Sequence, residues 1–161
     1  MKKLFYIGAL SALLLAACGE DEAKPKEEKT VSAEIEQKQE KNPVEEAVKT
    51  VIKDDYEIVE SDDGLVRINI KDKKLHEGSK SQILKKSGKI FAELSKVESI
   101  QSPSIYWFAP LTDQYGNEEM GEVYGIFFDA ETFKKVNWDN YEKLDLEAIA
   151  PGYKQHESLK D

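Results

Sequence analysis

Apolar and polar residues alternate in two pairs of segments, and this pattern predicts β-strands. Residues 56–60 and 65–70 flank Asp63-Gly64, a dipeptide typical of tight hairpin turns. In the second of these segments every other residue is apolar, so one face of the strand is expected to be buried. Residues 104–112 and 122–128 show the same alternation and predict a second hairpin.

Between the two pairs the apolar spacing changes to that of a helix. Residues 79–97 carry an apolar stripe opposite lysines, and Ser79 and Gln82 have the spacing of a capping box. Gly88 interrupts this helix, and its expected role is a close approach to the sheet. A short C-terminal helix is predicted after Asp129. The predicted fold class is α+β: a small antiparallel sheet of two hairpins, packed by one amphipathic helix, with a short C-terminal helix.

Aromatic residues occur on both predicted faces of the second hairpin. Either the sheet is covered on both sides, or Tyr106, Phe108 and Tyr124 form an exposed aromatic surface. Exposed aromatic side chains are frequent anchors of protein interfaces. With two further aromatic residues of the region, the predicted partner-binding surface comprises Tyr106, Phe108, Tyr115, Tyr124 and Trp138.

The N-terminus combines a positive start, Met1–Lys3, with an apolar run, Leu4–Leu15, and ends in Ala16-Ala17-Cys18. This order resembles the signal peptide and lipobox of bacterial lipoproteins. The resemblance implies a signal peptide over residues 1–17, diacylglycerol on Cys18, and anchoring at the extracytoplasmic face of the cell membrane. A plain secretory signal and an uncleaved membrane helix are the alternatives, although a span needs about twenty apolar residues.

Composition divides the rest of the chain into three parts. Residues 18–50 are rich in charged residues and have no aromatic side chain, which predicts a disordered tether behind the lipidated cysteine. A single α+β domain is predicted over residues 51–150, and residues 151–161 are predicted to be a tail. The domain is similar to small uncharacterised lipoproteins of low-GC Gram-positive bacteria, a resemblance carried by residues 112–117 and 135–138. Lysine greatly outnumbers arginine, which also favours a Gram-positive envelope.

Charge limits the classes of partner. The chain has 23 basic and 32 acidic residues, and removal of residues 1–17 takes away Lys2 and Lys3 and no acid. Such an excess of negative charge opposes binding to nucleic acid and to anionic lipid headgroups. The membrane contact is therefore expected through the lipid on Cys18, with no nucleic-acid partner.

No catalytic signature follows the signal. Cys18 is the single cysteine, and His76 and His156 have no ligand at metal-binding spacing. We therefore predict no catalytic residue, no metal and no cofactor. The leading hypothesis is a non-enzymatic, lipid-anchored module that binds a protein or peptide of the cell envelope, as an exclusion or inhibitor-type lipoprotein would. The alternatives are a small-ligand carrier, a cell-wall-acting enzyme using paired carboxylates, and a released signal fragment with activity of its own.

Overall fold

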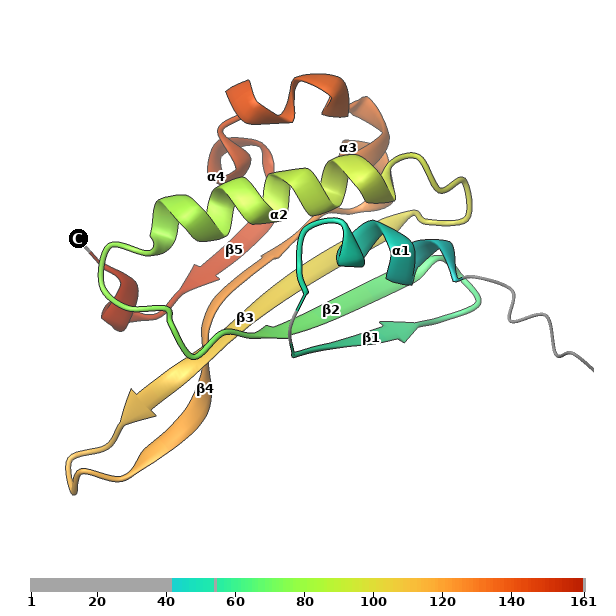
Figure 1. Cartoon of the computed structure of the whole chain (residues 1–161). Coiled ribbons are helices and arrows are strands. Elements are labelled where there is room, and N and C mark those ends of the chain that lie inside the picture. The colour runs from blue at the N-terminus through green and yellow to red at the C-terminus, as the bar shows by residue number, and fades with distance from the viewer. Residues whose placement is uncertain (1–41, 54, 161) are drawn as a thin grey trace, which may run out of the picture. The chain divides into compact units, whose positions relative to one another are not determined.

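The computed structural model describes residues 42–53 and 55–160. The predicted signal peptide, Cys18 and most of the predicted tether lie outside these residues. The described part is an α+β domain, as predicted, with helices packed on a five-stranded sheet (Figure 1). Its elements are α1 (Pro43–Lys49), β1 (Tyr56–Glu60), β2 (Leu65–Lys71), α2 (Lys80–Leu94), β3 (Ser102–Thr112), β4 (Glu118–Phe127), α3 (Ala130–Lys135), the 3-10 helix η1 (Trp138–Lys143), α4 (Leu146–Ile149), β5 (Gly152–Gln155) and the 3-10 helix η2 (Glu157–Leu159).

The strands lie side by side in chain order, from β1 to β5. The two expected hairpins, β1–β2 and β3–β4, are antiparallel, and β5 adds to β4 in the same sense. However, β2 and β3 run parallel, so the sheet is mixed. The prediction of a purely antiparallel sheet is wrong in this respect. The reason is the long connection between the hairpins: the chain leaves β2, crosses through α2 and returns in the same direction.

Helix α2 packs its apolar side against one face of the sheet (Figure 1). Ile83, Ile90 and Leu94 on this helix are fully buried and share one core with strand residues such as Ile68 and Trp107. Helix α1 packs against α2 and adds Val44 and Val48 to the same core. The helices therefore cover one face of the sheet, and the apolar alternation of the strands points to that face.

Two local features of α2 differ from the predictions. The capping box does not form, because the Ser79 hydroxyl makes no bond to the helix end and accepts instead the His76 backbone N–H at 3.0 Å. Gly88 faces the C-terminal segment rather than the sheet: a Cβ atom there would lie 3.4 Å from Tyr141 and 3.5 Å from Leu146. The glycine therefore allows close packing of α2 against η1 and α4.

The packed unit extends beyond the range 51–150 predicted for the domain. At its start, Asn42 caps α1 by accepting the Val44 N–H at 2.8 Å, and Val48 is completely buried. At its end, β5 pairs with β4, and Leu159 in η2 is only 1% exposed. Residues assigned to tether and tail on composition are thus part of the core, because a few apolar side chains in each are placed where they can be buried.

Candidate functional site

One face of the sheet faces away from the helices (Figure 1). On β2 the residues of this open face, Leu65, Arg67 and Asn69, alternate with three buried aliphatic residues. On β3 the half-buried Tyr106 and Phe108 alternate with the buried Ile105 and Trp107 in the same way.

Exposed apolar side chains gather at one place on the open face. Val59, Leu65 and Phe127 are 50%, 48% and 43% exposed, and all three border a single hollow of about 410 Å³. Arg67 and Tyr106 also line it. We call this the open-face groove, defined by Val59, Leu65, Arg67, Tyr106 and Phe127.

The strand register explains the hollow. Val59 lies opposite Arg67, Arg67 opposite Ser104, and Ser104 opposite Phe127, so these residues form one row across four strands. Ser104 is the small member of the row, and its hydroxyl donates to the Val66 carbonyl oxygen at 3.2 Å. The large side chains on either side of Ser104 therefore leave a depression above it.

The rings that border the groove rest on glycines of neighbouring strands. A Cβ atom on Gly125 would lie 2.8 Å from the Tyr106 ring, and one on Gly152 would lie 2.6 Å from the Phe127 ring. The Arg67 guanidinium carbon lies 4.1 Å from the centroid of the Tyr106 ring. These contacts hold the rings close to the backbone before any partner binds, which lowers the entropy lost on association.

The structure brings only part of the predicted partner-binding surface together. Tyr106 borders the groove, whereas Phe108 lies further along β3 on the same face and outside it. Tyr115 lies at the tip of the β3–β4 hairpin and is 81% exposed.

Two of the five predicted contact residues are part of the core and are removed from the surface. Tyr124 and Trp138 are 0% and 5% exposed. Tyr124 lies opposite Trp107, and its hydroxyl donates to Glu147 at 3.0 Å. Burial raises the pKa of Tyr124, and the Glu147 charge adds to the effect.

Trp138 packs into an aromatic cluster of the C-terminal segment. Its ring centroid lies 5.1 Å from that of Phe133 and 5.2 Å from that of Phe128, and its indole N–H donates to the Phe133 carbonyl oxygen at 2.9 Å. The Trp138 ring is therefore buried, and its N–H group is hydrogen-bonded, inside the domain.

A β-bulge explains the misplacement of Tyr124. Trp107 pairs with Tyr124 but the next residue, Phe108, pairs with Glu122, so Val123 is an extra residue in β4. One inserted residue reverses the face of every side chain beyond it. Register counted from the turn, where Thr112 lies opposite Glu118, would place Tyr124 opposite Tyr106 on the open face, and the bulge places it opposite Trp107 instead.

Sequence reasoning missed Val59, Leu65 and Phe127. Their signal is an apolar residue at a position where the alternation of a half-exposed strand calls for a polar one. One such residue is common on a surface, and only the fold shows that three of them share a groove.

The described residues contain no group of three or more histidine, cysteine or carboxylate side chains that could hold a metal ion. His76 is exposed, with Nδ1 3.2 Å from the buried Ser79 hydroxyl. His156 precedes η2, where its Nδ1 accepts the Ser158 N–H at 3.1 Å. Both imidazoles thus contact a neighbouring serine of the same turn.

Within residues 42–53 and 55–160, none of the helices has both the length and the apolar character needed to cross a bilayer. The described residues form an α+β domain that exposes an apolar groove on the uncovered face of its sheet. Comparison of the chain with protein-family models, curated proteins and solved structures gives no match in any of the three.

Proposed function

We propose that the protein is a lipid-anchored binding module on the extracytoplasmic face of the cell membrane, without enzymatic activity. In this proposal the open-face groove binds a protein of the cell envelope, as an exclusion or inhibitor-type lipoprotein would. The carrying observation is that, among the described residues, three of the five large exposed hydrophobic side chains border one groove. Clustered exposed apolar residues with a polar rim are typical of interaction sites. The lipobox at Cys18 supports the location.

The apolar residues of the groove can supply a useful part of the binding free energy. Complete burial of a valine, leucine or phenylalanine side chain is worth about 1.5–3 kcal/mol. Since Val59, Leu65 and Phe127 are about half exposed, a partner that covers all three gains about 3 kcal/mol in total, or roughly a hundredfold in affinity.

Charge indicates the chemistry of the partner. Glu60 of β1 lines the groove, and the chain as a whole carries a formal net charge of −9. We therefore propose a partner whose apolar patch is bordered by lysine or arginine residues. Opposite charges at the rim mainly accelerate encounter and reject acidic competitors.

Site-specific photo-crosslinking in intact cells tests this proposal. A photoreactive side chain at Leu65 of the full-length chain should capture one discrete envelope protein. The same group at Tyr115, on the exposed hairpin tip outside the groove, is the matched control and should not capture it. The product at position 65 should disappear when Phe127→Ser is added, and also with Cys18→Ala if anchoring delivers the domain to its partner.

The melting temperature of each variant shows whether the domain still folds. For folded variants, equal capture from positions 65 and 115 would show that the groove does not select the partner. Persistence of the product with Phe127→Ser would lead to the same conclusion. No discrete product from position 65 would reject the groove as the binding site and favour the carrier or enzyme alternatives.

A further inference from the structure

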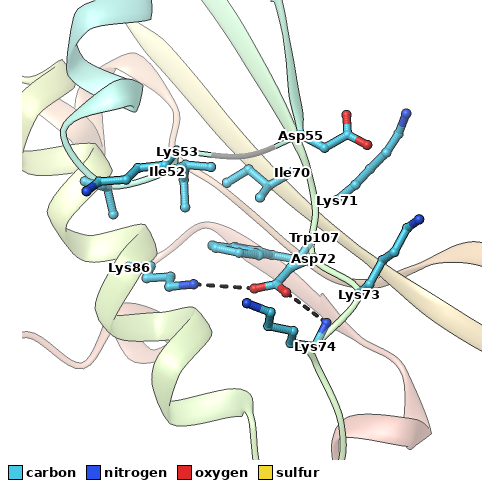
Figure 2. A pocket seen from close by; sticks show the side chains of 11 residues that line it. Ile52, Lys53, Asp55, Ile70, Lys71, Asp72, Lys73, Lys74, Lys86 and Trp107 are labelled. Atoms are coloured by element: carbon cyan, nitrogen blue, oxygen red, sulfur yellow. Dashed lines mark hydrogen bonds and ion pairs between the residues drawn. The ribbon is translucent and has the colours of Figure 1, made fainter.

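A second hollow, separate from the open-face groove, lies where the chain leaves β2 (Figure 2). It has a volume of about 570 Å³ and is bounded by the segment after α1, the end of β2 and the side of α2. We call it the lysine pocket, and its lining comprises Val51, Ile52, Lys53, Asp55, Ile70, Lys71, Asp72, Lys73, Lys74, Lys86 and Trp107.

The position of the lysine pocket follows from the sheet topology. Strands β2 and β3 are parallel, and β2 stops at Lys71 opposite Phe108 while β3 continues to Thr112. The chain then turns away toward α2 and leaves a crevice at the carboxyl end of β2. Crevices at the carboxyl ends of parallel strands are a general location for ligand sites in sheets covered by helices.

The floor of the lysine pocket is apolar. Ile52, Ile70 and Trp107 line it, and they are 6%, 1% and 0% exposed. The Trp107 indole N–H donates to the Ser87 hydroxyl at 3.0 Å, so the base of the pocket contains no unsatisfied indole donor. The Lys86 ammonium lies 5.4 Å from the centroid of the same indole.

Lysines dominate the walls. Five of the fifteen lysines of the described residues line this one pocket, together with only two aspartates. In Figure 2, Lys86 reaches Asp72 from the side of α2, and Lys74 extends toward the same carboxylate. The Lys86 ammonium lies 3.4 Å from Asp72 Oδ2, and Asp72 Oδ1 accepts the Lys74 backbone N–H at 2.9 Å.

Asp72 is thus paired with Lys86, and the other four lysines of the pocket have no such ion pair among the described residues. Within residues 42–53 and 55–160, no carboxylate lies within ion-pair distance of Lys53, Lys71, Lys73 or Lys74. The lining holds five lysines against two aspartates, a net charge of +3, and a bound anion would relieve the repulsion among the ammonium groups. The positive sign is also opposite to that of the whole chain, whose net charge is −9.

We infer that the lysine pocket binds an organic phosphate, with the phosphate held by lysine ammonium groups and an apolar part packed against Val51 and Ile52. Lysine is a common phosphate ligand because it provides a compact charge with three donors on a flexible stem. A lining of five lysines and two aspartates suits a dianionic phosphate better than a single carboxylate. The phosphate can belong to a soluble ester or to a lipid headgroup, and the two sources require separate measurements.

Isothermal titration calorimetry of the full-length chain in phosphatidylcholine nanodiscs tests the site, with phenyl phosphate and inorganic phosphate as probes. Phenyl phosphate is expected to bind at least tenfold more tightly than inorganic phosphate, because its ring packs against Val51 and Ile52. The triple variant Lys53→Gln, Lys73→Gln, Lys74→Gln should weaken phenyl phosphate binding at least tenfold. The matched control, Lys134→Gln, Lys143→Gln, Lys160→Gln, removes the same charge from exposed lysines elsewhere and should change it less than twofold.

Several results would overturn the inference. These are the absence of saturable binding of either probe, equal losses in the two triple variants, and equal affinity for the two phosphates. Circular dichroism melts of both variants verify that the domain remains folded.

Nanodiscs containing phosphatidic acid, whose headgroup is a phosphate monoester, distinguish the two sources of phosphate. Unchanged phenyl phosphate binding in these discs assigns the pocket to soluble esters. A loss of at least tenfold that is absent from discs of phosphatidylcholine alone assigns it to the lipid headgroup.

Discussion

Gly64 connects the first hairpin to the chain that follows α2. It has φ +79°, and its carbonyl oxygen accepts the N–H groups of Gln101 at 2.9 Å and Ser102 at 3.2 Å. These bonds position the start of β3 next to β2, where the parallel pair begins. The glycine thus serves both the local turn and a pairing between distant segments.

We expect Gly64→Ala to destabilise the domain by about 2–3 kcal/mol. A left-handed backbone conformation costs a non-glycine residue about 1 kcal/mol or more, and the added Cβ atom would lie 2.5 Å from the Ser99 carbonyl oxygen. Urea unfolding monitored by tryptophan fluorescence measures the change. Gly116→Ala is the matched control, since Gly116 has φ +84° but a Cβ atom added there would meet nothing within 4 Å, and about 1 kcal/mol is expected. Equal losses would show that the contact with Ser99 is unimportant.

Asp113 fixes the turn of the second hairpin. Its Oδ1 accepts the N–H groups of Tyr115 at 2.8 Å and Asn117 at 2.9 Å, and its Oδ2 accepts the Asn117 side-chain N–H at 2.9 Å. These bonds lower the pKa of Asp113 below its ordinary value, and the bond from the Asn117 side chain has the largest effect.

We expect Asp113→Asn to be less stable than the native protein at pH 7, with a difference that disappears in acid. Because the pKa is lower in the folded state, the stabilisation is fully present above the unfolded pKa of about 4 and is lost as the pH falls through the folded value. Urea midpoints of both proteins between pH 7 and pH 2 measure this. A difference that stays constant over the whole range would mean that the charge of Asp113 makes no contribution.

At the scale of elements, local sequence signals predict the two hairpins and α2. They do not predict how the two hairpins pair with each other in the sheet. The Asp63-Gly64 turn and the alternation of β2 involve neighbours in sequence, and both are present in the structure. The parallel pairing of β2 with β3 joins residues far apart, such as Ile70 and Trp107, and no local pattern encodes it. Strand β5 has only four residues, too few for a period to be recognised.

The C-terminal elements allow a direct test of their place in the core. We expect Leu159→Ala to destabilise the domain by about 2–3 kcal/mol, because it removes a side chain that is 1% exposed. Lys160→Ala, at the adjacent exposed position, should change the free energy of unfolding by less than about 0.5 kcal/mol. Chemical denaturation of the two variants provides the comparison. If Leu159→Ala were as mild as Lys160→Ala, η2 would contribute little to the folded domain.

At the scale of the whole molecule, charge counting describes the average and conceals the local pattern. The run Lys71-Asp72-Lys73-Lys74 is visible in the sequence, but Lys53 and Lys86 join it only because the segment after α1 and the side of α2 meet at the end of β2. Likewise, Val59 and Phe127 border the same groove although they lie in opposite hairpins. Both candidate sites are assembled from several elements, so neither is apparent as a motif.

The packing of α1 has a mechanical consequence. Under the proposed lipid anchoring at Cys18, a pull from the membrane side enters the described domain at Asn42 and reaches α1 first. Resistance to that pull comes from the hydrogen bond that the Asn42 side-chain N–H donates to Glu60 at 2.7 Å, from the burial of Val44 and Val48, and from the contact of α1 with α2. None of these is a ladder of strand hydrogen bonds. Side-chain packing of one short helix yields at lower force than a sheared pair of strands, so α1 would detach before the sheet opens and would act as the extensible link between anchor and domain.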